Sequence, residues 1–209
     1  MGAAVPSQSP RSMGTVMETA PTVWTVGHSN HELERLVRLL HAARIEFVID
    51  VRSYPYSRYA PQFNREALEA SIPRHGMRYV FLGEQLGGRP TLEEHYDVDG
   101  HALYGPMSEE QAFTDAVQRV IHRAREHRLA LLCSEAHPRH CHRRLLVGKV
   151  LTESGVRLEH ILPEGDVHSE ETVVLPGENA QCSLLGEEEP WRSTQSVSRR
   201  ARLSSSSAA

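Results

Sequence analysis

Apolar residues in the middle of the chain follow two patterns that alternate with each other. Short apolar runs predict strands over residues 23–26, 47–51, 78–82, 129–133 and 156–162. Apolar residues at helical spacing predict helices over residues 33–43, 65–72, 113–124 and 138–155. Because parallel strands need crossover connections, this alternation predicts an α/β fold. We expect a single domain, a three-layer sandwich with a mainly parallel, doubly wound sheet of about five strands.

The two ends of the chain lack this hydrophobic pattern. Residues 1–21 are rich in small polar residues and proline, and residues 164–209 are low in complexity and contain a serine run at residues 204–207. Such composition is typical of disordered segments. We therefore expect a folded domain over residues 22–163 between two largely disordered tails, in which Trp191 is the one residue that could dock.

Composition narrows the classes of partner. The 209 residues carry a formal net charge of −4, so no overall positive field attracts nucleic acid, and any such contact has to be local. The three cysteines give no secreted disulfide framework. No segment approaches the roughly 20 consecutive apolar residues of a membrane span. We expect a cytoplasmic protein that does not associate with membranes.

Polar residues cluster directly after the first four predicted strands. They are His28 and Ser29 after the first, Asp50, Arg52 and Ser57 after the second, Gly87 and Gly88 after the third, and Cys133, Glu135, Cys141, His142 and Arg143 after the fourth. The connections at the other ends of the strands look like ordinary solvated helix ends. Ligands in open α/β sheets bind outside the carboxyl ends of the strands. The sequence therefore predicts one functional site at this edge.

Several of these residues stand in ordered motifs. The motifs are Thr25-Val26-Gly27-His28-Ser29, Asp50-Val51-Arg52 with Pro55 and Ser57, Leu86-Gly87-Gly88, and Leu132-Cys133-Ser134-Glu135 followed by Cys141-His142-Arg143. Together they resemble the bacterial and archaeal domain of unknown function 488, over roughly residues 22 to 162. The resemblance implies a fold and a site but no reaction, so the chemistry has to come from the residues.

Two carboxylates, Asp50 and Glu135, follow apolar strands, where an unpaired charge is costly. Arg52 and Arg143 are their evident partners. The arginines could hold an anionic ligand while a carboxylate serves as general base. Alternatively, the four residues form a structural lattice of ion pairs. On the functional interpretation, Asp50 and Glu135 are catalytic, and Arg52 and Arg143 bind the substrate.

Cys133 ends the most apolar strand and precedes a helix, where backbone amides and the helix dipole lower the pKa of a thiol. The interval from Cys133 to Arg139 also matches the phosphate loop of cysteine phosphatases. Glu135 adds negative charge, Pro138 removes an amide and no glycine is present, so we do not expect a phosphate cradle. Cys133 is a candidate catalytic residue, or else a buried small hydrophobe.

His142 is a candidate general acid or base. It could also join Cys141, Cys133, Glu135 or His28 around zinc. The two cysteines are separated by seven residues, which is not a standard zinc spacing, and we expect no metal ligand. No dinucleotide glycine motif follows the first strand, which favours hydrolysis or group transfer over redox chemistry. The other residues expected to bind substrate are His28, Ser29, Ser57, Gly87, Gly88 and Cys141.

The residues together predict a small α/β enzyme, a hydrolase or group transferase. We expect it to act on a nucleotide, a nucleic-acid base or another anionic small molecule. Tyr54, Tyr56 and Tyr59 in the loop after the second strand could stack a base or simply cover the core. One alternative is a module that binds or senses a small ligand or nucleic acid without turnover. Another is thiol chemistry centred on Cys133.

Overall fold

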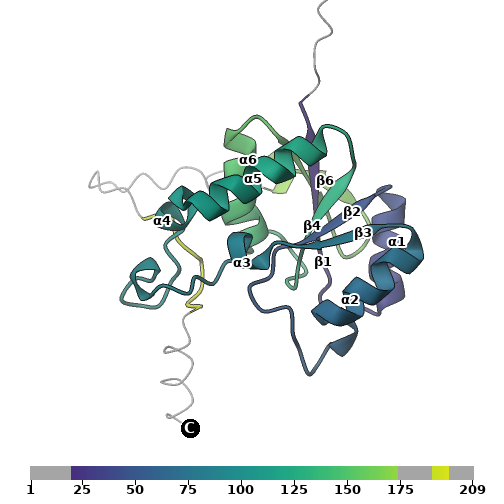
Figure 1. The fold of residues 1–209 in the computed structure, drawn as a ribbon, viewed down its shortest axis with the longest axis horizontal. Coiled ribbons are helices and arrows are strands. Elements are labelled where there is room, and N and C mark those ends of the chain that lie inside the picture. The colour runs from purple at the N-terminus through teal and green to yellow at the C-terminus, as the bar shows by residue number, and fades with distance from the viewer. Residues whose placement is uncertain (1–19, 174–189, 198–209) are drawn as a thin grey trace, which may run out of the picture.

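The computed structural model describes residues 20–173 and 190–197. Its strands form one six-stranded sheet in the order β3-β2-β4-β1-β5-β6 (Figure 1). The strands are β1 (Thr22–Gly27), β2 (Phe47–Asp50), β3 (Arg78–Phe81), β4 (Leu129–Cys133), β5 (Arg157–Ile161) and β6 (Val167–Ser169). The α-helices are α1 (Leu33–Ala42), α2 (Arg65–Ser71), α3 (Gly83–Leu86), α4 (Tyr104–Glu109), α5 (Gln111–Ala124), α6 (Lys149–Glu153) and α7 (Glu170–Val173). The first five strands are parallel, and only β6 pairs antiparallel, with β5.

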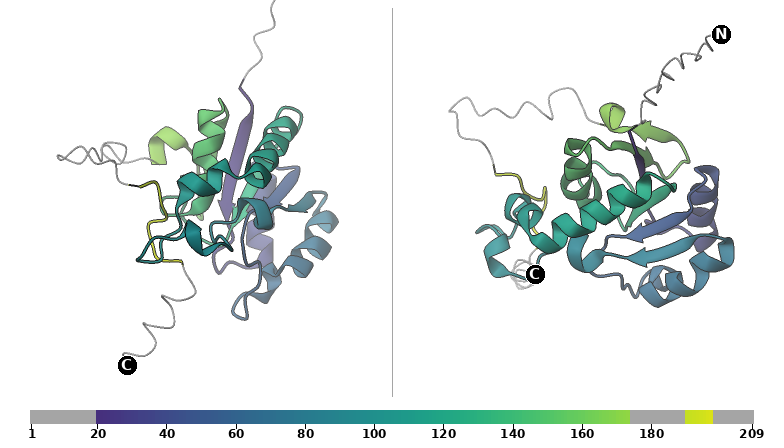
Figure 2. Two further views of the ribbon diagram at one scale, coloured as in Figure 1. Left: turned by 60° about the vertical axis from the view of Figure 1, so that its left-hand side comes forward. Right: turned by 45° about the horizontal axis from the view of Figure 1, so that its top comes forward.

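Two hydrophobic cores, one on each face of the sheet, make the three layers. The apolar faces of α1 and α2 pack on one face, and α5 and α6 pack on the other (Figures 1 and 2). Strand β4 lies in the middle of the sheet, and all five of its residues are buried. It serves both cores, since Leu131 belongs to one and Leu132 to the other. This is why its sequence shows no polar alternation. The expected α/β class is confirmed, with six strands rather than about five.

The sixth strand comes from a segment that the sequence pattern places in the C-terminal tail. Glu170 follows β6, and its carboxylate accepts hydrogen bonds from Arg144 at 2.8 Å and from the buried His160 at 2.7 Å. These contacts hold the segment against the end of the sheet. Hydrophobic periodicity does not predict these contacts, because they are polar and join residues far apart in the sequence.

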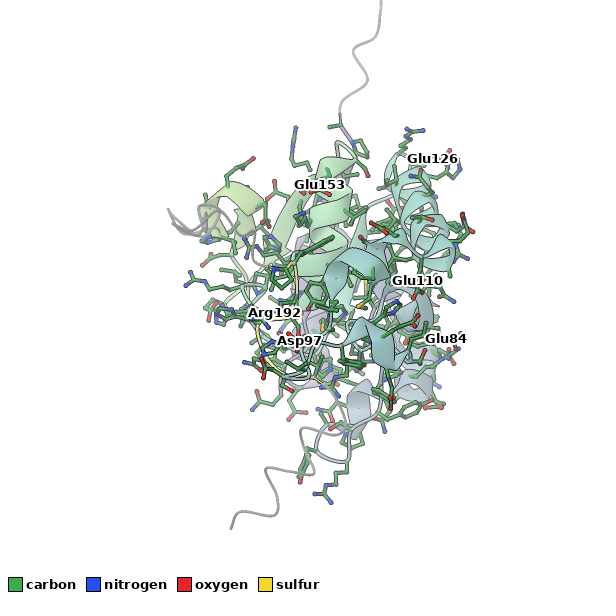
Figure 3. The ribbon with its side chains drawn as sticks, turned by 90° about the vertical axis from the view of Figure 1, so that its left-hand side faces the viewer. Glu84, Asp97, Glu110, Glu126, Glu153 and Arg192 are labelled. Carbon is green, nitrogen blue, oxygen red and sulfur yellow. The ribbon has the colours of Figure 1, made fainter. Side chains whose placement is uncertain are left out.

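Residues 190–197 also pack on the domain. The indole Nε1 of Trp191 donates to the carbonyl of Leu145 at 2.8 Å, and the backbone of Ser193 donates to Ala102 at 2.8 Å. Arg192 pairs with Asp97, and Figure 3 shows these two side chains next to each other. Trp191 therefore docks, and its neighbours dock with it. The remainder of both expected tails lies outside the described residues.

The last long helix starts later than its apolar pattern suggests. Residues 138–140 form a turn that Cys141 closes by donating its backbone N–H to Pro138 at 3.0 Å. Helical structure begins at His142 and runs through a π-helical stretch, Arg143–Gly148, into α6. Cys133 and Cys141 are thus joined by a compact loop rather than by a helix.

The strand order creates a crevice at the carboxyl end of β4. The helices that follow β1 and β2 cover one face of the sheet, whereas the helix that follows β4 covers the opposite face. Since β1 and β2 are the two neighbours of β4, the chain diverges on both sides of Cys133. Ligands in open α/β sheets bind at such switch points. The topology therefore centres the predicted site on β4.

No helix in the described ranges 20–173 and 190–197 is both long enough and apolar enough to cross a membrane.

The close approach of β1 to the loop after β4 gives a first prediction. A Cβ atom on Gly27 would lie 1.8 Å from the backbone oxygen of Glu135, so the loop has to move in Gly27→Ala. Because overpacking costs about 1–3 kcal/mol, we expect a fall of this size in the free energy of urea unfolding. Gly105→Ala is the control, since a Cβ there meets no atom within 4 Å. Equal stabilities for the two variants would contradict the packing described.

Candidate functional site

A pocket of about 440 Å³ lies over the carboxyl ends of the strands. Its lining includes His28 after β1, Arg52 after β2, Gly88 after α3, and Cys133, Glu135 and His142 from the β4 connection. Backbone hydrogen bonds continue the sheet into these loops: His28 donates to Cys133 at 2.9 Å and Val51 donates to Leu132 at 3.1 Å. The pocket floor is therefore an extension of the rigid central sheet.

Asp50 and Arg52 form a buried ion pair. The Arg52 guanidinium donates to both carboxylate oxygens of Asp50, from Nε at 2.9 Å and from Nη2 at 2.5 Å. Tyr79 donates its hydroxyl to Asp50 at 2.7 Å, and Arg52 also donates to the carbonyl of Phe63 at 2.9 Å. Asp50 is 0% exposed and does not line the pocket. The Asp50 carboxylate is therefore occupied by structural hydrogen bonds and does not contact the pocket, where a substrate would bind.

His28 is held in a single tautomer. Its Nδ1 faces the carbonyl oxygen of Ser29 at 2.7 Å, which can only accept, so Nδ1 carries the proton. Its Nε2 lies 3.0 Å from Nη1 of Arg52, which can only donate, so Nε2 accepts. Burial and the Arg52 charge lower the pKa of His28 from 6.5 to about 4. His28 is therefore neutral, and it stacks on Phe63 with ring centroids 4.3 Å apart.

His142 is oriented toward the thiol of Cys133. Its Nε2 donates to the carbonyl of Val51 at 2.8 Å, which leaves Nδ1 facing the Cys133 sulfur at 3.7 Å. A Cβ on Gly88 would lie 2.5 Å from the ring carbon Cγ of His142, so only glycine leaves room for this imidazole. A nucleophile, a base beside it and a third group that orients the base are the parts of a covalent catalytic site. Here a backbone carbonyl is the orienting group.

A second thiol and a buried guanidinium stand behind this pair. Cys141 is 0% exposed, and its sulfur lies 4.0 Å from Nδ1 of His142. Arg143 donates from Nη1 to the Cys141 sulfur at 3.4 Å. The same guanidinium donates to the carbonyls of Glu135 at 2.5 Å and Ala136 at 3.0 Å. Arg143 is itself 0% exposed, so it does not reach a ligand in the pocket.

The loop after Cys133 is built around this guanidinium and not around an anion. A phosphate cradle turns backbone amides toward its centre. The loop here turns the carbonyl oxygens of Glu135 and Ala136 inward, and Arg143 fills the space between them. The loop therefore does not have the form of a phosphatase loop, in spite of the interval from Cys133 to Arg139.

The electrostatics of the cluster favour a thiolate at Cys133. The pKa of Cys133 is held well below its ordinary value of 9.0, first by the hydrogen bond with the Cys141 thiol and then by the charge of His142, against the effect of burial. Burial and the nearby Cys133 raise the pKa of Cys141. Burial lowers the pKa of His142, but the Cys133 charge and hydrogen bond outweigh it and give a net rise. These directions agree on one arrangement: a Cys133 thiolate, a His142 imidazolium and a Cys141 thiol.

Glu135 stands at the pocket wall. The residue as a whole is exposed, yet partial burial of its carboxyl group and the adjacent Cys133 raise its pKa. It is the one acidic residue of the predicted set that borders the pocket. A carboxyl group with a raised pKa is suited to proton transfer.

The predicted site residues divide into two groups. Those that line the pocket are His28, Ser29, Arg52, Ser57, Gly88, Cys133, Glu135 and His142. Asp50, Gly87, Cys141 and Arg143 are buried beside it, and Gly87 packs so closely on Ser53 that a Cβ would lie 2.3 Å from its hydroxyl.

Other parts of the pocket lining were not predicted. They include Ser53, Tyr104, His140, Thr194 and Gln195. Tyr104 is buried and stands on the short helix α4, which is distant in the sequence from the end of any strand. The pattern of polar residues after strands therefore carries no signal for it.

Within the described residues, one group of side chains is spaced to hold a metal ion: Cys133, Cys141 and His142, whose ligand atoms all lie within 4.8 Å of one another. His28 does not belong to it, because Arg52 and Ser29 occupy both of its ring nitrogens.

Fold and site together define a doubly wound α/β domain with two thiols and an imidazole at its switch point. The chain belongs to the family described as "Domain of unknown function DUF488", whose model matches residues 32–150. This confirms the resemblance seen in the motifs, although Thr25–Ser29 precede the matched segment. No curated protein and no solved structure matches the chain significantly.

The buried neutral His28 makes stability depend on pH. The unfolded chain protonates His28 near 6.5 and the folded chain near 4, so the unfolded state binds more protons between these values. Folding stability is therefore lost as the pH falls through this window, by up to about 3 kcal/mol from this group. We expect the urea midpoint of the protein to fall between pH about 7 and pH about 4.5.

The variant His28→Gln isolates the contribution of His28 to the pH dependence of stability. A glutamine oxygen can accept from Arg52 but does not titrate, so the variant loses less stability over the same interval. An equal loss in the variant and the parent protein would contradict the assignment.

Proposed function

We propose that the protein is a thiol-dependent hydrolase or group transferase in which Cys133 is the nucleophile. The observation that carries the proposal is the position of His142, fixed by the Val51 carbonyl and facing the Cys133 sulfur at 3.7 Å on the pocket floor. Of the sequence-based hypotheses, the geometry supports the thiol-centred one best.

The same geometry argues against a reaction run by the predicted carboxylate and arginine pairs. Asp50 is occupied by Arg52 and Tyr79. Arg143 is occupied by backbone carbonyls and by Cys141. A general base needs hydrogen-bond reach to the substrate, and an anion clamp needs a guanidinium that faces it. Asp50 has no such reach to a substrate, and the guanidinium of Arg143 does not face the pocket.

In the proposed reaction the Cys133 thiolate attacks an electrophilic carbon of the substrate. A sulfur–carbon bond forms, the bond to the leaving group breaks, and the leaving group takes the proton from Nδ1 of His142. Water or an acceptor alcohol or amine then attacks the same carbon and gives its proton to His142. The sulfur–carbon bond breaks, and its electron pair restores the Cys133 thiolate. Glu135, at the pocket wall, can assist the proton transfer of the second step.

We expect a small polar substrate with a planar group, because of the side chains that form the pocket wall. Tyr54, Tyr56 and Tyr59 line it, and they are 51%, 57% and 81% exposed, which is unusual for large aromatic side chains. Exposed aromatic faces stack planar rings, as in sites for nucleobases. A nucleoside or nucleobase derivative therefore fits better than a simple phosphate, since the Arg52 charge is already balanced by Asp50.

The test is the reactivity of Cys133. With iodoacetamide at pH about 7, mass spectrometry of the peptides should show Cys133 modified far faster than a cysteine in the unfolded chain. Para-nitrophenyl acetate should acylate the same sulfur with a burst of nitrophenol. We expect His142→Gln, which can keep the bond to Val51, to slow both reactions by about 10-fold or more.

His137→Gln is the matched control, because His137 is exposed and lies outside the pocket lining. Unchanged rates in His142→Gln, or a Cys133 that reacts no faster than in urea, would refute the proposal. Stoichiometric zinc on the purified protein, with Cys133 protected from both reagents, would refute it as well.

A further inference from the structure

In the proposed hydrolytic or transfer reaction only one of the two buried thiols, Cys133, forms a bond to the substrate. Both Cys133 and Cys141 are free thiols. Their sulfur atoms lie within 4.8 Å of each other and of Nδ1 of His142. Only Cys133 lines the pocket, and Cys141 lies directly behind it at 0% exposure. A reagent that enters the pocket therefore meets Cys133 first and Cys141 second.

We propose that Cys133 and Cys141 form a reversible dithiol–disulfide couple that exchanges with small disulfides and thiols in the pocket. This inference rests on the same nucleophilic Cys133 as the proposed function, and it adds redox chemistry that needs no dinucleotide. Cys133 is the attacking thiol and Cys141 the resolving thiol.

The exchange balances with a small disulfide as oxidant. The Cys133 thiolate attacks one sulfur of the disulfide, forms a mixed disulfide and releases the first small thiolate. Cys141 then loses its proton to that thiolate and attacks the Cys133 sulfur, which releases the second thiolate, protonated by His142. The dithiol loses two electrons, and the small disulfide becomes two thiols. The reverse sequence reduces the protein.

The loop between the two cysteines allows their sulfur atoms to approach and form a disulfide. A disulfide needs a sulfur–sulfur distance of about 2.05 Å, so the two sulfurs have to approach from their present separation. Cys141 stands at the end of a turn and before the first helical residue, outside the sheet. Several residues between the cysteines, including Ser134, His137 and His140, are exposed and have room to shift.

The buried charges favour the reduced form of the Cys133–Cys141 couple over the disulfide. Arg143 is fully buried, its Nε has no hydrogen-bond partner among the described residues, and one of its amino groups donates to Cys141. In the reduced protein the thiolate of Cys133, whose pKa the Arg143 charge helps to lower, balances this charge. A disulfide carries no charge and His142 gives up its proton in the exchange, so oxidation leaves the Arg143 guanidinium without that balance. Stabilising the reduced form makes a disulfide a stronger oxidant, so the Cys133–Cys141 bond should be easily reduced.

The experiment equilibrates the full-length protein with buffers of reduced and oxidised glutathione. After acid quenching and alkylation, peptide mapping measures the Cys133–Cys141 disulfide separately from any bond to Cys182. We expect this disulfide to form in the parent protein. In Cys141→Ser, glutathione should remain attached to Cys133, whereas Cys133→Ser should show no glutathione on Cys141, which the pocket does not reach.

A comparison of unfolding stability tests whether the buried charges favour the reduced form. We expect the urea midpoint of the oxidised protein to lie below that of the reduced protein, because oxidation removes the negative charge beside Arg143. Most disulfides raise stability. A higher midpoint on oxidation would overturn the assignment of an oxidising couple.

The outcomes separate the two proposals. If Cys133 is alkylated quickly but no Cys133–Cys141 disulfide forms and Cys141→Ser holds glutathione no longer than the parent protein, the redox couple is refuted and the catalytic thiol stands. If Cys133 neither alkylates nor takes up glutathione, both fail.

Discussion

The whole site depends on one buried positive charge. Arg143 has 0% exposure, and within the described part of the chain its partners are two backbone carbonyls and a sulfur atom, with no carboxylate among them. A guanidinium stays protonated inside a protein, and an uncompensated buried charge costs several kcal/mol. The carbonyls of Glu135 and Ala136 solvate the charge and thereby shape the loop. The sulfur atoms supply the remaining compensation: Arg143 donates to Cys141, and its charge adds to the effects of Cys141 and His142 that lower the pKa of Cys133.

The other groups of the site follow from that loop and from the strand order. The loop comes so close to β1 that residue 27 has to be glycine, and it brings His142 against the end of β2, where the Val51 carbonyl receives its Nε2–H. The imidazole thus connects the end of β2 to the thiol at the end of the neighbouring strand β4. His28 and Arg52 support the floor from the other side through the Asp50 ion pair. Rigid elements therefore place the reactive sulfur, and loops supply the walls of the pocket.

The sequence predicted the five parallel strands, the three layers and the edge that carries the polar residues, because short apolar runs and their flanking residues are local signals. It could not distinguish Arg52 from Arg143, or Asp50 from Glu135, since each pair has the same chemistry and differs only in its three-dimensional neighbours. Tyr79 and the Phe63 carbonyl, which occupy Asp50 and Arg52, gave no signal at a strand end. Docking of residues 190–197 depends on contacts with residues about 50 to 100 positions away, such as that of Trp191 with Leu145, and no periodicity encodes these.

The proposed chemistry requires Cys133 to be ionised near neutral pH. The most direct measurement is the pH dependence of the ultraviolet absorbance of thiolate, taken as the difference between the parent protein and Cys133→Ser, which needs no reagent to enter the pocket. We expect one thiolate in the difference spectrum at pH about 7, which disappears only on stronger acidification. A difference signal that appears only as the pH rises toward the ordinary thiol value of 9.0 would contradict it.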